Sequence, residues 1–244
     1  METVTLCCSL FSPKGDVLRV NNTAKWYKSL SRVAGVPFKL VLINDQSEES
    51  FDHLIPHIKP VGYCTDVQYF ESPDRVGKAK QLNRVFPYIT TKYVGIIDND
   101  VILPPKWLHN VLVVLSVPQV ATCGVVVEDW IGMGPTYAVY NENQDPVNYT
   151  YPQVLGGACV VWNKAKLKEE GLLWEGGGVY GHEDAEFNQR IARRVGKVAS
   201  LTEKGYSISD KTNQGWEKWK QEQSKATHML FYERMADLSK DDRL

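Results

Sequence analysis

The chain has 244 residues, 43% of them hydrophobic, and its 28 basic and 29 acidic side chains leave a net charge of −1. This size allows one large domain or two small ones with a substantial core. The balanced charge provides no overall attraction to nucleic acid or to an anionic membrane. No apolar run approaches the roughly 20 residues that span a bilayer, and the N-terminus lacks the pattern of a signal peptide. We therefore expect a cytoplasmic protein without stable membrane insertion.

Strand-like and helix-like segments alternate along the first hundred residues. The strand-like segments are apolar and β-branched and end at polar turn residues, whereas the helical ones have apolar residues at helical spacing. This alternation predicts an α/β fold with a mostly parallel sheet covered by helices on both faces. The expected strands lie at residues 3–11, 38–43, 67–70 and 93–97, and the expected helices at 22–35, 51–58 and 79–86.

Two carboxylates, Asp98 and Asp100, follow the apolar run of residues 93–97. An unpaired charge is disfavoured inside a buried strand, so the pair is expected at the carboxyl end of the strand, where open α/β sheets bind ligands. Hard oxygen ligands of this kind suit Mg²⁺ or Mn²⁺ better than zinc. Asp-Asn-Asp is also an ordinary turn sequence, and the pair alone does not decide between the two interpretations.

The second half of the chain is less regular. Residues 128–153 are rich in Gly, Pro, Tyr and Asn and show no strand or helix pattern, which is typical of functional or mobile segments. The tail at 216–238 has a helical composition, and its two tryptophans one turn apart are expected to pack on the domain. The other elements expected here are helices at 107–115, 164–170 and 183–195, and strands at 120–127 and 155–162.

A second acidic pair, Glu183 and Asp184, begins one of these helices. Acidic residues are common in the first turn of any helix because they complement its dipole. Here, however, a triple glycine precedes the pair, and Tyr180 and His182 lie in the same loop, as in a pocket with a movable wall. One of the two carboxylates could serve as a general base toward a bound hydroxyl.

The order of these motifs resembles the family-2 type of nucleotide-sugar glycosyltransferases, which have the GT-A fold. The resemblance covers about residues 3–205 and depends on several blocks in the right order, which together are more specific than any single block. The blocks are residues 38–47 with Asp45, residues 77–83 beginning Gly77-Lys78, residues 97–100 with both aspartates, Gly156-Gly157-Ala158, and residues 181–184 ending in Glu183-Asp184.

The resemblance implies a role for each matched residue. Asp45, helped by the chain from Ser9 to Phe11, would hold the base or ribose of the nucleotide, and Lys78, with Arg75, would lie near the diphosphate. Asp98 would contact the ribose or a water bound to the metal, Asp100 would ligate Mn²⁺ or Mg²⁺, and Asp184 would be the base, with Glu183 supporting the pocket. The implied reaction is the transfer of a sugar, most simply from a UDP-sugar and with inversion, to an acceptor hydroxyl.

The sequence departs from the family pattern at two places. Asn44-Asp45 replaces a pair of aspartates, and Asp210 stands where many relatives have a metal-binding histidine. A carboxylate is a suitable replacement for that ligand of a hard cation. We expect residues 1–213 to form one GT-A domain, with 1–100 as the nucleotide-binding half and 101–213 as the acceptor half. Residues 214–244 would be a helical extension packed on it.

Other functions fit less well. A nucleotidyltransferase would need a Gly-rich basic loop after the first strand, and only Pro13-Lys14-Gly15 is present there. A non-catalytic nucleotide-sugar or carbohydrate-binding module of the same fold stays open, because fold alone does not establish chemistry. The acceptor is not identified. Trp130, Tyr180 and His182 are the candidate acceptor contacts, and a modified nucleic acid is an acceptor that the sequence does not favour.

Overall fold

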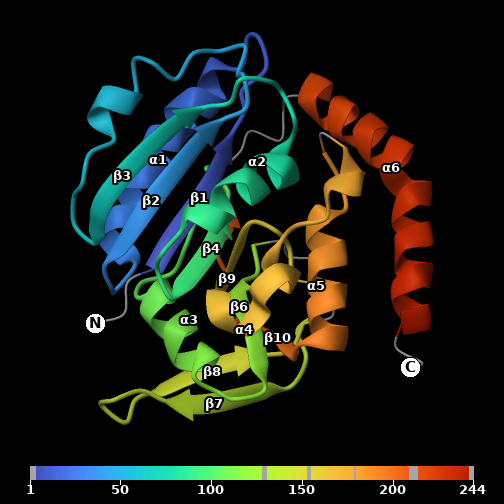
Figure 1. The fold of residues 1–244 in the computed structure, drawn as a ribbon. Coiled ribbons are helices and arrows are strands. Elements are labelled where there is room, and N and C mark those ends of the chain that lie inside the picture. Colours follow the sequence, from blue (N-terminus) through green and yellow to red (C-terminus); the bar gives the residue numbers. More distant parts are fainter. Residues whose placement is uncertain (1–3, 128–130, 153–154, 179, 209–213, 242–244) are drawn as a thin grey trace.

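The computed structural model describes residues 4–127, 131–152, 155–178, 180–208 and 214–241. A nine-stranded sheet crosses the centre in the order β3-β2-β1-β4-β9-β6-β10-β8-β7, with helices on both sides (Figure 1). Its strands are β1 (Val4–Leu10), β2 (Phe38–Asn44), β3 (Cys64–Glu71), β4 (Tyr93–Ile97), β6 (Val120–Val125), β7 (Thr136–Tyr140), β8 (Pro146–Thr150), β9 (Cys159–Asn163) and β10 (Lys197–Leu201). The α-helices are α1 (Val17–Val33), α2 (Lys78–Val85), α3 (Trp107–Leu115), α4 (Lys164–Leu167), α5 (Glu183–Arg194) and α6 (Gln214–Asp241).

The strand directions place the carboxyl ends of the first strands at one edge of the sheet. β1 pairs in parallel with β2 and β4, and β2 pairs in parallel with β3. β9 is antiparallel to both of its neighbours, β4 and β6, and β10 returns to the parallel direction beside β6. The mixed sheet is mostly parallel and covered by helices, which confirms the expected α/β class.

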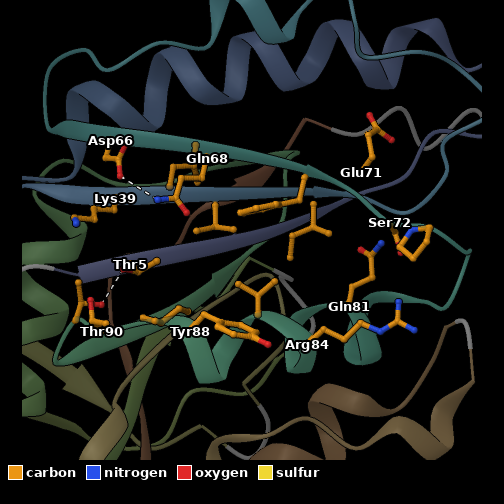
Figure 2. A pocket seen from close by; sticks show the side chains of 18 residues that line it. Thr5, Lys39, Asp66, Gln68, Glu71, Ser72, Gln81, Arg84, Tyr88 and Thr90 are labelled. Carbon is orange, nitrogen blue, oxygen red and sulfur yellow. Dashed lines mark hydrogen bonds between the residues drawn. The ribbon is translucent and has the colours of Figure 1, made fainter.

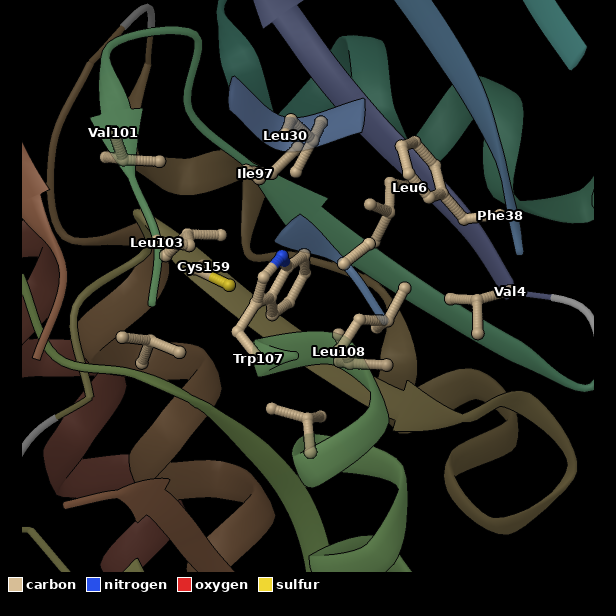
Figure 3. Close-up of a cluster of buried hydrophobic side chains, with 14 of the residues drawn as sticks. Val4, Leu6, Leu30, Phe38, Ile97, Val101, Leu103, Trp107, Leu108 and Cys159 are labelled. Carbon is tan, nitrogen blue, oxygen red and sulfur yellow. The ribbon is translucent and has the colours of Figure 1, made fainter. Parts of the chain in front are cut away.

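Alternating side chains of the strands supply a hydrophobic core on each face of the sheet. On one face, Leu6 and Phe38 pack with Leu30 of α1 and with Trp107 and Leu108 of α3 (Figure 3). The opposite face packs against α2 and α5, through the buried residues Val41, Ile43, Ile96, Leu82, Phe187 and Ile191. All five cysteines are buried and unpaired and belong to these cores.

Two expectations about individual elements are wrong. Residues 136–150, taken as irregular, form the β7–β8 hairpin, which joins the sheet through β8 and β10. Its strand β7 is almost entirely exposed, so it lacks the apolar alternation on which a sequence pattern depends. Residues 51–58 do not form an α-helix; a single 3₁₀ turn at Ile55–His57 stands there, with Pro56 inside it.

Helix α6 packs along the outer side of α5 (Figure 1). Glu186 of α5 is fully buried and accepts hydrogen bonds from Arg190 at 2.9 Å and from Arg234 of α6 at 3.0 Å. Phe231 and Leu238 of α6 are buried as well. A buried carboxylate is strongly destabilising without its cations, so this contact fixes the C-terminal half of α6. None of the described helices is long and apolar enough to cross a membrane.

Candidate active site

A polar cavity of about 130 Å³ lies where the chain leaves β1, β2 and β4. It gathers residues that are far apart in the sequence, including all six residues expected to bind the donor, both aspartates of the first acidic pair, and Tyr180. The lining residues are Ser9, Phe11, Arg19, Asp45, Arg75, Lys78, Asp98, Asn99, Asp100, Tyr180, Trp219 and Lys220.

Asp45 is held rigidly at the floor of this cavity. One carboxylate oxygen accepts hydrogen bonds from the backbone amide of Val76 and from the side chain of Gln81, and the other accepts from the amide of Gly77, all at 2.9 Å. Gln81 also accepts a hydrogen bond from the hydroxyl of Ser9 at 2.7 Å. The carboxylate therefore fixes the turn that leads into α2, besides facing the cavity.

That turn depends on glycine and places Lys78 inside the site. Gly77 has φ = +85°, a conformation that residues with a side chain rarely adopt. Lys78 follows at once and donates to the carboxylate of Asp98 at 2.5 Å and to the carbonyl of Gly157 at 3.2 Å. Burial alone would lower the pKa of Lys78, but the nearby carboxylates outweigh it and raise the pKa above the ordinary 10.5, so the lysine is cationic.

Asp98 and Asp100, the two aspartates after β4, carry like charges that repel each other. Burial is the main reason why the pKa of Asp100 is raised above its ordinary 3.8, and the negative charge of Asp98 raises it further. Three cations oppose this effect. The backbone carbonyl of Asp100 accepts from the amide of Ile208 at 2.7 Å, and this contact extends the small pairing of β5 (Val101–Ile102) with β11 (Tyr206–Ser207). The pair thus concentrates negative charge that a cation would stabilise.

The second acidic pair lies beside Lys78 at the start of α5. Asp184 accepts from the amides of Gly157 at 2.9 Å and Ala185 at 2.7 Å. Glu183 is buried and accepts from the amide of Gly181 at 3.2 Å. Burial and the adjacent charge of Asp184 raise the pKa of Glu183 above 4.5. The pair therefore combines a buried carboxyl whose pKa is raised with a neighbour held by two amides.

Gly157 lies against this pair, and its replacement is expected to disturb the site. A Cβ atom there would lie 2.9 Å from Cβ of Asp184 and 3.4 Å from Nζ of Lys78. Gly157→Ala should therefore displace Asp184 and lower the rate of sugar transfer about 100-fold. The measurement is the release of nucleoside diphosphate from the donor, with a melting curve to check folding.

Gly132→Ala is the matched control for this variant, because a Cβ there meets nothing within 4 Å. It should leave the rate unchanged. An unchanged rate in Gly157→Ala as well would show that the position of Asp184 does not matter for the reaction.

The remaining candidate acceptor and metal residues are His182, Trp130 and Asp210. The ring of His182 stacks on Phe231 of α6 at 4.6 Å, and its Nε2 lies 3.3 Å from the carbonyl of Ser224, so His182 contacts α6 and not the cavity. Trp130 and Asp210 lie outside the described residues. Their assignments stay predictions.

Four lining residues were not expected from the sequence: Arg19, Asn99, Trp219 and Lys220. Arg19 lies in the first turn of α1, near its N-cap Asp16. Asn99 is buried and donates to the hydroxyl of Thr23 at 2.6 Å. Only Trp219 and Lys220 had a sequence signal, an aromatic residue next to a cation in a tail of helical composition, and that signal is equally typical of a helix packed on a core.

A larger groove of about 500 Å³ runs along β1, β2 and β3 beside α2 (Figure 2). None of the expected site residues lines it. Its floor is apolar, whereas Lys39, Asp66, Glu71 and Arg84 are polar residues along it. Gln81 connects this groove to the polar cavity, because it lines the groove and hydrogen-bonds to Asp45.

The fold and the cavity together define the class of protein. A mostly parallel sheet covered on both faces, with an acidic pair and several cations where its first strands end, is the arrangement expected of a GT-A glycosyltransferase. The family model "Glycosyl transferase family 2" matches residues 20–159, more than half of the chain. The chain belongs to this family of glycosyltransferases.

Solved structures with the same fold are similar to this chain at low sequence identity. GalNAc-T7, solved with UDP, GalNAc and Mn²⁺, has a TM-score of 0.63 at 14% identity over 86% of this chain and 44% of that one. The mannosyltransferase PcManGT from Pyrobaculum calidifontis, in complex with GDP-Man and Mn²⁺, has a TM-score of 0.61 at 14% identity over 87% and 59%. S. aureus TarS 1–349 in complex with UDP-GlcNAc has a TM-score of 0.60 at 12% identity over 87% and 60%.

The chain thus spans less than two thirds of the length of each of these proteins. A search of curated proteins found no match.

Proposed function

We propose that the protein is a metal-dependent glycosyltransferase that moves a sugar from a nucleoside-diphosphate sugar to an acceptor hydroxyl. The observation that carries this proposal is the convergence of the six expected donor residues, from four separate segments, on one polar cavity. Three structural neighbours were solved with UDP, GDP-Man or UDP-GlcNAc, which supports a nucleotide-sugar donor. Among these, a UDP-sugar is our proposed donor.

The cations of the cavity suit a diphosphate. The lining contains four of them, Arg19, Arg75, Lys78 and Lys220, against three carboxylates. Cζ of Arg75 lies 3.9 Å from the centre of the Phe11 ring, so this guanidinium is placed by stacking and can still donate hydrogen bonds to phosphate oxygens. Lys78 also forms an ion pair with Asp98, and this contact holds that carboxylate in place.

The residues present fit a divalent cation. Asp98 and Asp100 are hard oxygen donors, and burial together with the charge of Asp98 raises the pKa of Asp100. No third His, Cys, Asp or Glu joins them among the described residues, so phosphate oxygens and water would complete the coordination of Mn²⁺ or Mg²⁺. When bound, such a cation neutralises the charge that develops on the departing diphosphate.

The start of α5 supplies the base in the proposed reaction. The carboxylate of Asp184 takes the proton of the acceptor hydroxyl as that oxygen forms a bond to the anomeric carbon. The bond from this carbon to the diphosphate breaks, and its electron pair leaves with the phosphate oxygen. Burial and the adjacent charge of Asp184 raise the pKa of Glu183, while the amides of Gly157 and Ala185 hold the carboxylate of Asp184 in place. A single displacement of this kind inverts the anomeric configuration.

The proposal is tested by calorimetric titration of the protein with UDP-sugars and GDP-mannose, each with and without Mn²⁺. We expect one donor to bind in a metal-dependent manner and its nucleoside diphosphate to be released slowly to water as the acceptor. Binding without any release, even with a panel of acceptor sugars, would favour a non-catalytic binding module. No binding of any donor would contradict the proposal.

A further inference from the structure

Helix α6 lies beyond residues 20–159, the part that matches the family model, yet it forms part of the wall of the donor cavity. The ring of Trp219 lies 6.4 Å from that of Phe11, nearly parallel at 28°, and 5.9 Å from that of Tyr180. It also lies 5.3 Å from the guanidinium carbon of Arg75. All three partners line the cavity, so Trp219 packs against the donor site itself.

The two halves of α6 are attached to the domain differently. The C-terminal half is buried at Phe231 and Leu238, and Arg234 forms its ion pair with the buried Glu186. No described side chain of residues 218–230 is buried. The N-terminal half is therefore held through the rim of the cavity and through the contacts of Ser224 with His182. Few buried contacts mean a low free energy for local displacement.

The cavity is small for a nucleotide. Sites for small ligands and cofactors usually enclose about 300–1,000 Å³, whereas this cavity encloses about 130 Å³. The ring centres of Phe11 and Trp219 are 6.4 Å apart, and the guanidinium of Arg75 lies over both rings, 3.9 Å from the first centre and 5.3 Å from the second. An outward shift of Trp219 would enlarge this volume.

Lys220 follows Trp219 and lines the same cavity. It lies close enough to Asp100 for its charge to act on that carboxylate. The carboxylate pair is where the diphosphate and its cation are expected, so an ammonium group at this place can donate to a phosphate oxygen. Lys218, one residue before Trp219, has 78% of its side chain exposed and pairs with Glu222 on the surface.

We propose that the N-terminal half of α6 is a movable wall of the donor site, in which Lys220 binds the diphosphate and Trp219 shifts outward to admit the nucleotide. The inference rests on the proposed function, because it assigns two further residues to the same donor site. It also explains why a half-buried aromatic residue and a half-buried cation stand side by side on α6, between the exposed residues Lys218 and Gln221.

The test measures the binding of UDP and GDP to the full chain by calorimetry in the presence of Mn²⁺. Lys220→Gln should weaken the binding of the nucleoside diphosphate by roughly tenfold or more, since a hydrogen bond to a charged group is lost. It should leave the much weaker binding of the nucleoside unchanged. Lys220→Arg should restore most of the affinity, and Lys218→Gln, the control on the same helix, should bind like the wild type.

Movement of the wall has its own readout in the tryptophan fluorescence. The emission of the wild type should change when the nucleotide binds, and most of this change should disappear in Trp219→Phe. Equal affinities of Lys220→Gln and Lys218→Gln, or an undiminished change in Trp219→Phe, would overturn this inference while the proposed function stands. Failure of the wild type to bind either nucleotide would overturn both.

Discussion

Asp184→Asn is expected to lower the rate of sugar transfer by about 10²–10⁴-fold, the usual contribution of a general base, while donor binding stays close to that of the wild type. Asparagine has the same shape, and its carbonyl oxygen can still accept one of the amide hydrogen bonds that hold Asp184. It cannot take a proton from the acceptor. The measurements are the turnover for release of nucleoside diphosphate and the calorimetric affinity for the donor.

Two comparisons show whether Asp184 acts as a base. Glu183→Gln replaces the neighbouring carboxyl, which is buried and is proposed to support the pocket, and should reduce turnover much less. Asp237→Asn replaces an aspartate with a side chain that is 66% exposed, far along α6, and should have no effect. If Asp184→Asn instead weakened donor binding in proportion to turnover, Asp184 would be a residue that shapes the site around Gly157.

Asp100→Asn is expected to have opposite effects on binding and stability. Removing a proposed direct ligand should weaken the metal-dependent part of donor binding by at least the roughly 10–100-fold seen for indirect partners of a metal. The metal-free variant should nevertheless be more stable than the wild type at neutral pH. The reason is that asparagine does not carry the charge whose burial raises the pKa of Asp100.

The pH dependence follows from the direction of this shift. A folded-state pKa above the unfolded value of 3.8 means that the folded protein binds the proton more tightly. Below pH 3.8, Asp100 is protonated in both the folded and the unfolded protein, so it does not lower the free energy of unfolding of the wild type. As the pH rises through the raised pKa, the wild type loses stability, by about 1.4 kcal/mol for each unit of elevation. The free energy of unfolding of Asp100→Asn should therefore exceed that of the wild type by a difference that grows with pH and then becomes constant.

Denaturant unfolding of both proteins without metal, from pH 4 to pH 8, measures this difference. Asp52→Asn is the control, because Asp52 lies on an exposed turn away from the cavity. A stability difference that is independent of pH would contradict the electrostatic explanation. Metal-dependent donor binding that survives in Asp100→Asn would remove Asp100 from the proposed ligand set.

Much of the site could be inferred from the sequence because of a geometric rule. Parallel strands end at the same edge of a sheet, so polar residues that follow successive apolar runs converge there. Ser9 lies at the end of β1, Asp45 and Asp98 follow β2 and β4, and all three line the cavity. The β7–β8 hairpin could not be inferred, since its exposed strand has no apolar alternation and is held by pairing with β10 through β8.

The sequence by itself determined the α/β class, the position of Asp98 and Asp100 after a buried strand, and the family, because local periodicity and strand-end chemistry are properties of short segments. Only the tertiary structure decided the partners of individual side chains. It showed that Asp45 fixes the turn before α2, that Lys78 pairs with Asp98, and that His182 faces α6. It also brought Trp219 and Lys220 to a cavity formed by residues 9–100 and 180. Such contacts join segments that are as far apart in the sequence as Phe11 and Trp219, so no local sequence pattern indicates them.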